Sequence, residues 1–133
     1  MPLTAYTANL IATAHANGTS YQGPATVHLA LVTTTPTKTV AGTEQTLGVG
    51  NYARKSFATS GWTNDGAGGL VNTAELAYPT TDEDYDDAIV AVEAYSASTA
   101  GTRLWFIVLA NARLVTSGTI PRFPAGDLEL TFV

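Results

Sequence analysis

The feature that most constrains this chain is a succession of short strand-like segments separated by turn residues. Val27, Leu29 and Leu31 alternate with other residues between Thr26 and Thr33, the period-two pattern of a strand with a buried face. Pro36 then ends this segment. Further segments of the same kind cover residues 52–58, 70–78, 88–95, 103–110, 114–120 and 128–132. About seven short strands with Gly and Pro turns predict a mainly β fold.

The strand pattern predicts an antiparallel β-sandwich or jelly-roll-like domain over residues 24–133. Residues 38–51 and 61–69 are rich in glycine and polar residues, which predicts a long loop and a flexible connector. The apolar run Trp105–Leu109 predicts a central strand buried on both faces. Because the 133 residues contain no internal repeat, we expect a single domain over residues 1–133.

An N-terminal helix is predicted within residues 1–18, with its core over residues 3–16. Leu3, Tyr6, Leu10 and Ala14 recur at helical spacing and form an apolar stripe. Asn17-Gly18 is a typical stop signal. A helix this short needs a packing partner. That partner is either the protein's own sheet or another chain.

Composition excludes several classes of function. Charged residues make up 13% of the chain, the net charge is −5 and cysteine is absent. The absence of cysteine excludes disulfides and thiolate sites, and the acidic balance argues against nucleic acid as a partner. No apolar run approaches the ~20 residues that span a bilayer, and the N-terminus lacks a signal-peptide pattern, so we expect neither a membrane partner nor secretion. The 22 threonines and 21 alanines leave a largely neutral surface, which suits either contacts with neighbours or simply an exposed Thr-rich sheet.

One acidic segment could carry chemistry. Asp82, Asp84 and Asp86, together with Glu93, have the spacing of a calcium loop, but Asp87 occupies the position where the loop needs glycine. We therefore expect a solvated acidic loop, or one that meets basic residues of a neighbour. A looser cation site is the alternative.

No catalytic constellation is present in the sequence. The serines lie in no nucleophile-elbow context, and two isolated histidines make no zinc site. We therefore expect no enzymatic activity, metal or cofactor. Arg54, which follows Tyr52, can either bind a carboxylate bidentately and fix a loop or remain an exposed charge. Trp62 is expected to be a core or interface anchor.

Several of these segments together resemble a family of small bacteriophage virion structural proteins, known as tail-fibre-like or capsid decoration proteins. The resemblance rests on Val27–Val32 running into Thr33-Thr34-Thr35-Pro36-Thr37, on Gly50–Arg54, Leu76–Pro79, Ala91–Tyr95 and Thr99–Thr102, and on Pro124–Leu128. It implies a helix joined to a β-sandwich, a location in the virion and no enzymatic role. The acidic segment 82–87 departs from the neutral residues expected there.

The resemblance leads to two functional hypotheses. The first is a capsid decoration or minor capsid protein, a homo-oligomer and preferably a trimer, that stabilises the phage head after assembly in the bacterial cytoplasm. The second is a tail, baseplate or fibre-associated protein that binds host carbohydrate through Trp62 and nearby loops. A glycoside-cleaving enzyme using the carboxylates of residues 82–87 is disfavoured, because consecutive loop acids rarely hold the required separation. We expect partners among other virion proteins, and oligomer contacts that involve the N-terminal helix or the loop 34–50. The candidate interface or structural residues are Pro36, Tyr52, Arg54, Trp62, Asp82, Asp84 and Asp86.

Overall fold

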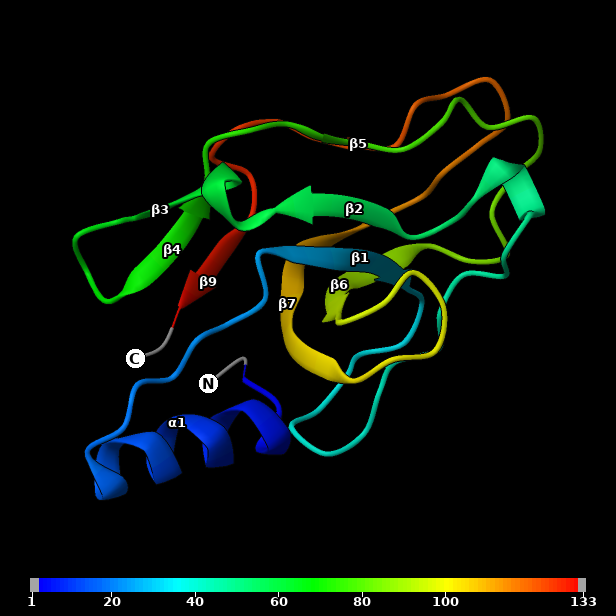
Figure 1. Cartoon of the computed structure of the whole chain (residues 1–133). Coiled ribbons are helices and arrows are strands. Elements are labelled where there is room, and N and C mark those ends of the chain that lie inside the picture. Colours follow the sequence, from blue (N-terminus) through cyan, green and yellow to red (C-terminus); the bar gives the residue numbers. More distant parts are fainter. Residues whose placement is uncertain (1–2, 132–133) are drawn as a thin grey trace.

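Three antiparallel sheets and one α-helix make up the structure, a computed structural model that describes residues 3–131 (Figure 1). The fold is mainly β and sandwich-like with an N-terminal helix, as predicted from the sequence. The elements are α1 (Ala5–Asn17), β1 (Thr26–Val32), β2 (Lys55–Ala58), β3 (Trp62–Asn64), β4 (Gly69–Asn72), β5 (Leu76–Ala77), β6 (Ile89–Tyr95), β7 (Arg103–Arg113), β8 (Arg122–Phe123) and β9 (Glu129–Thr131).

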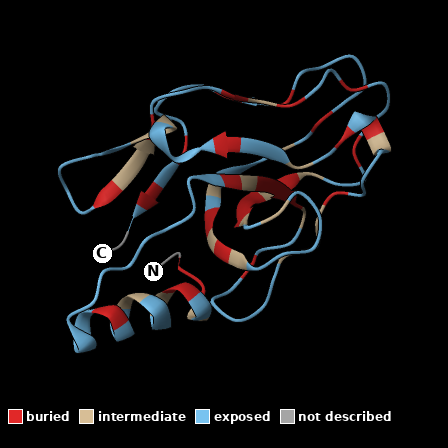
Figure 2. Cartoon of the chain, viewed as in Figure 1, coloured by how far each residue is buried: buried red, intermediate tan, exposed pale blue. Residues whose placement is uncertain are grey.

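The largest sheet has the strand order β2-β1-β6-β7, and the second has the order β3-β4-β9. A short ribbon pairs β5 with β8. The core between them is apolar and includes Leu29, Leu31, Ile89, Val92 and Leu128. Figure 2 shows the buried residues concentrated in β1, β6 and β7.

The inner strands of the largest sheet are β1 and β6, and the apolar run in β7 lies at its edge. The strand β1 lies between β2 and β6, and its residues from Leu29 to Val32 are fully buried. Its second face is covered by the loop that follows it. Within that loop, the backbone N–H of Gln45 donates to the carbonyl of Leu31, and Gly42 lies against Val32. A Cβ on Gly42 would come within 2.5 Å of the Thr34 carbonyl, so only glycine fits.

The prediction that Trp105–Leu109 forms a doubly buried central strand is wrong. The strand β7 is the edge of its sheet, and Val108 is 49% exposed. The β6–β7 register also shifts, because Ala91 pairs with Val108 whereas Ile89 pairs with Arg113. Residues 109–112 are thus opposed by Val90 alone, which is a bulge that bends the edge strand. A run of apolar residues shows strand length, but it does not show whether a strand has one neighbour or two.

Several other boundaries differ from the prediction. The segment 114–120 is not a strand, because the Thr81 hydroxyl donates to the carbonyls of Thr116 and Thr119 and holds a turn there. The predicted strand 70–78 is split at Asn72, whose side chain donates to the carbonyls of Ala74 and Pro124. The predicted strand 52–58 begins only at residue 55, and the connector 61–69 contains β3. The hairpin of β6 and β7 is confirmed. The predicted end of the last strand at Phe132 lies outside the described residues.

The helix α1 ends at the expected Asn17-Gly18 signal, but it begins at Ala5 rather than at the predicted residue 3. The side chain of Thr4 accepts from the backbone N–H of Thr7, and Gly18 closes the helix in the left-handed conformation with φ 63°. The Thr4 hydroxyl also donates to the carbonyl of Leu104, which ties the helix start to β7. At 13 residues α1 is too short to span a bilayer, and residues 3–131 contain no longer helix.

The helix does not bury the predicted apolar stripe. Thr7 and Ala14 are buried, whereas Tyr6 and Leu10 are 52% and 40% exposed. Figure 1 shows α1 set apart from the sheets, with its first turn nearest to β7. The helix therefore packs on its own domain through one side and leaves half of its apolar stripe open.

Candidate interaction surfaces

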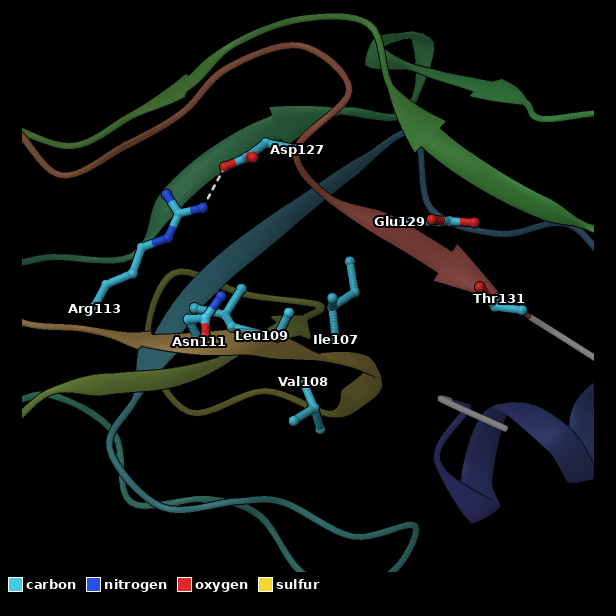
Figure 3. A pocket seen from close by; sticks show the side chains of 9 residues that line it. Ile107, Val108, Leu109, Asn111, Arg113, Asp127, Glu129 and Thr131 are labelled. Carbon is cyan, nitrogen blue, oxygen red and sulfur yellow. Dashed lines mark hydrogen bonds and ion pairs between the residues drawn. The ribbon is translucent and has the colours of Figure 1, made fainter.

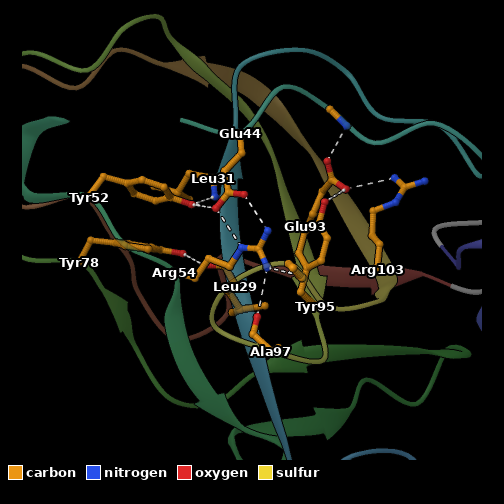
Figure 4. A network of polar contacts seen from close by, with 12 residues as sticks. Leu29, Leu31, Glu44, Tyr52, Arg54, Tyr78, Glu93, Tyr95, Ala97 and Arg103 are labelled. Atoms are coloured by element: carbon orange, nitrogen blue, oxygen red, sulfur yellow. Dashed lines mark hydrogen bonds and ion pairs between the residues drawn. The ribbon is translucent and has the colours of Figure 1, made fainter. Parts of the chain in front are cut away.

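The first candidate site is a network around Arg54, which we call the arginine brace. Arg54 binds Glu44 bidentately, with Nε–Oε1 at 2.9 Å and Nη2–Oε2 at 2.8 Å (Figure 4). The hydroxyl of Tyr52 donates to Glu44 Oε1 at 2.9 Å and accepts from the backbone N–H of Leu31 at 3.0 Å. Of the two alternatives for Arg54, the structure shows the bidentate contact.

The third nitrogen of the Arg54 guanidinium, Nη1, holds the β6–β7 turn. It donates to the carbonyls of Ala97 at 3.1 Å and Ala100 at 2.7 Å. The guanidinium carbon lies 3.8 Å from the ring centroid of Tyr95. The hydrogen bond to Glu44 raises the pKa of Arg54, and burial raises the pKa of Tyr52. The arginine brace thus joins the loop after β1 to the turn before β7, and its charges are satisfied internally.

Another carboxylate lies beside the arginine brace, and this one is buried. Glu93 is fully buried on β6, accepts from the backbone N–H of Gly42 at 2.6 Å and pairs with Arg103 at 3.2 Å. Loss of water around Glu93 raises its pKa. The sequence predicts for Glu93 only a possible place in a calcium loop. The signal for its true position is a single charge between the apolar pairs Ala91-Val92 and Ala94-Tyr95.

The acidic segment 82–87 is anchored by Tyr85, which is buried. Its carboxylates accept backbone N–H groups of other loops, as when Asp84 binds Ser117 at 2.8 Å and Asp86 binds Thr46 at 3.2 Å. The backbone carbonyl of Asp82 accepts from the Ser117 hydroxyl. These contacts draw three loops together. Within residues 3–131 no three His, Asp or Glu side chains form a group that could hold a metal ion.

Trp62 packs among aromatic residues, and Pro36 is buried in a loop. The Trp62 ring lies edge-on to Trp105 at 5.3 Å and to Phe57 at 5.4 Å. Its indole N–H is buried without a hydrogen-bond partner among the described residues. Pro36 is buried in the loop after β1. Trp62 thus packs against the rings of two neighbouring aromatic residues.

An open cleft of about 490 Å³ lies between β7 and β9 (Figure 3). Residues of β7 from Ile107 to Arg113 form one wall, and the guanidinium of Arg113 pairs with Asp127 at one end. Glu129 and Thr131 of β9 form the opposite wall. The cleft separates the edges of the two sheets.

A second open groove, also about 490 Å³, lies along α1, and we call it the tyrosine groove. One wall is a single helical stripe and the other is the segment after the helix. The lining residues are Tyr6, Asn9, Leu10, Thr13, Ala14, Thr19, Ser20, Tyr21 and Gln22. Gly18 makes this arrangement possible, because its left-handed conformation turns the chain back along the helix. The sequence predicts the helical stripe but not the segment that faces it.

No curated protein matches the chain significantly. A family profile described as Podophage GP4 fiber I protein gp80 matches residues 2–131, nearly the whole chain. The resemblance to bacteriophage virion proteins is thereby confirmed, and the chain belongs to the family of Podophage GP4 fiber I protein gp80.

Proposed function

We propose that this protein is a structural subunit of a podophage fibre and acts through noncovalent contacts with neighbouring virion proteins. The observation that carries the proposal is the fibre-protein family match over residues 2–131. It favours the fibre alternative over capsid decoration, which stays a prediction. In this proposal the protein is located in the virion and has no enzymatic role, cofactor, nucleic-acid partner or membrane partner.

The internal contacts support a scaffold role. The arginine brace and the acidic segment use their charged groups to hold loops to one another. Loops held in this way keep a fixed surface, as a protein that contacts neighbours requires. Exposed large apolar side chains provide contact area outside the core, namely Tyr6, Leu10, Tyr21, Val40, Leu47, Val108, Leu114 and Ile120.

Deletion of the gene from the phage tests the proposal. Virions without the protein should lose fibre density in electron micrographs and adsorb poorly to cells, while their heads keep normal resistance to heat and chelators. Complementation from a plasmid is the control. Heads that become sensitive to heat or chelator, with fibres and adsorption intact, would replace the fibre role with capsid decoration.

We further propose that the fibre subunit forms a homo-oligomer, with a trimer favoured. The support is the neutral, charge-poor surface, since 13% charged residues leaves few groups to be desolvated on association. Native mass spectrometry of the purified chain should show three copies. A monomer at micromolar concentration contradicts this assembly and leaves the fibre location to the deletion experiment.

A further inference from the structure

We propose that the tyrosine groove binds a neutral carbohydrate. This inference deepens the proposed function and rests on it for the setting, because a fibre subunit presents its surfaces to the outside of the virion. The binding chemistry itself comes from the groove. Three properties of the groove carry it: free hydrogen-bonding groups, exposed aromatic rings and the absence of charge.

The polar side chains of the tyrosine groove are not used by the fold. Elsewhere in the loops such side chains bind the backbone, as Thr37 does at Val40 and Asn64 at Gly66. In the groove the described residues provide no hydrogen-bond partner for the side chains of Asn9, Thr13, Thr19, Ser20 and Gln22, or for the hydroxyls of Tyr6 and Tyr21. Two amides and five hydroxyls each both donate and accept. Sugar hydroxyls also donate and accept, and their spacing along a ring suits several such groups at once.

The two tyrosines supply the apolar contact that a sugar ring needs. Tyr6 and Tyr21 are 52% and 39% exposed, whereas Tyr52, Tyr78 and Tyr85 are buried. A pyranose carries C–H groups on one face, which pack on the electron-rich face of an aromatic ring. Leu10 adds a further apolar surface beside them. Exposed rings next to free polar groups therefore match a ligand that is both hydroxylated and partly apolar.

The charge of the tyrosine groove decides among ligand classes. None of its nine lining residues is Asp, Glu, Lys or Arg, although the chain has a net charge of −5. Phosphate or nucleic acid would need basic groups. A second copy of this chain would need about 800 Å² of contact per partner, whereas three large exposed apolar side chains line this groove. A volume of about 490 Å³ suits one or two sugar units.

Titration of the ¹⁵N-labelled full chain with neutral sugars tests the proposal. The probes are the methyl glycosides of glucose, galactose and mannose, together with rhamnose and N-acetylglucosamine. At least one probe should shift amide signals of residues 6–22, with an affinity that does not change with salt concentration. Tyr6→Ala and Tyr21→Ala should each weaken binding about tenfold, as expected for the loss of an aromatic contact. Val40→Ser, at another exposed apolar position, is the matched control and should leave binding unchanged.

Each other outcome overturns the inference. The inference fails if no probe shifts the groove signals, or if the shifts map to the cleft between β7 and β9 or to Trp62. It also fails if Val40→Ser weakens binding as much as Tyr21→Ala. A loss of oligomer mass in Tyr6→Ala, with sugar binding absent, would instead assign the groove to contacts between copies. Phage carrying Tyr21→Ala separates this inference from the proposed function. Such virions should retain fibres and adsorb poorly, and normal adsorption with fibres present would remove the carbohydrate role while leaving the fibre role intact.

Discussion

The arginine brace and the tyrosine groove use similar side chains in opposite ways. In the arginine brace, Tyr52 is 1% exposed and its hydroxyl both donates and accepts. In the tyrosine groove, Tyr6 is 52% exposed and its hydroxyl has no partner among the described residues. Tyrosine thus stabilises the fold in the arginine brace, whereas its hydroxyl remains free in the tyrosine groove.

The difference lies in the backbone around each site. The arginine brace binds two carbonyls of the β6–β7 turn, those of Ala97 and of Ala100, which has a positive φ. The α1 backbone satisfies its own groups, so its outward side chains have no backbone to bind. Polar side chains on a helix beside a returning loop can therefore remain available to a ligand. In irregular loops such side chains form hydrogen bonds with the local backbone instead.

The largest expected effect is at Arg54. Arg54→Met leaves the carboxylate of Glu44 without its cation and the carbonyls of Ala97 and Ala100 without a donor. Because the Arg54 side chain is only 8% exposed, we expect the free energy of unfolding to fall by about 3 kcal/mol. Urea denaturation at neutral pH measures it. Arg122→Met, an exposed charge, is the control, and a loss below about 0.5 kcal/mol at Arg54 would mean that the arginine brace does not hold the loops.

Tyr52→Phe should have the next largest effect. The substitution removes the acceptor of the Leu31 N–H and one donor to Glu44, and both lie in a buried region. Leaving a buried backbone N–H unpaired costs about 1–3 kcal/mol. The matched control is Tyr6→Phe in the tyrosine groove, where the hydroxyl has no partner to lose among the described residues. Equal losses of stability for the two substitutions in urea denaturation would contradict the difference between the two tyrosine hydroxyls.

Glu93, beside the arginine brace, should make the stability of the fold depend on pH, whereas the uncharged residues of the tyrosine groove should not. Its pKa is raised in the folded state by burial, so the folded protein binds the proton more tightly than the unfolded chain. The contribution of Glu93 to stability is therefore fully present below its ordinary pKa of about 4.5 and is lost as the pH rises through the raised value. The test is the urea midpoint of the wild type minus that of Glu93→Gln, measured across this pH range. This difference should fall as the pH rises. A difference that rises with pH would show that the Arg103 ion pair outweighs burial.

Local signals in the sequence were enough to predict the element types and several contacts. The Thr26–Thr33 alternation, the Asn17-Gly18 stop and the bidentate potential of Arg54 all correspond to features of the structure. Each of these depends on residues close in sequence or on a property of one side chain. The matching family supports the phage fibre assignment, which the residues alone left open between head and tail.

What could not be predicted depends on which elements become neighbours. The apolar run of β7 carries no sign that β1 and β6 would take the inner positions of the sheet. Likewise, the helical stripe did not show that Thr7 would be buried while Tyr6 stayed exposed, because that depends on where the helix start attaches to Leu104. The tyrosine groove arises from the return of the chain after Gly18, and nothing in the period of the helix specifies that path.

The smallest effect should also have the opposite sign. Asn9→Ala and Thr13→Ala remove groove side chains that have no hydrogen-bond partner among the described residues. Alanine is the best helix former, so each substitution should raise the free energy of unfolding by up to about 0.7 kcal/mol. Thr7→Ala, at a buried helical position, is the control and should not stabilise. Urea denaturation decides: a loss above about 1 kcal/mol at Asn9 or Thr13 would show that these side chains serve the fold. A gain would mean that the helix retains residues its own stability does not require, as expected where side chains are kept for a ligand.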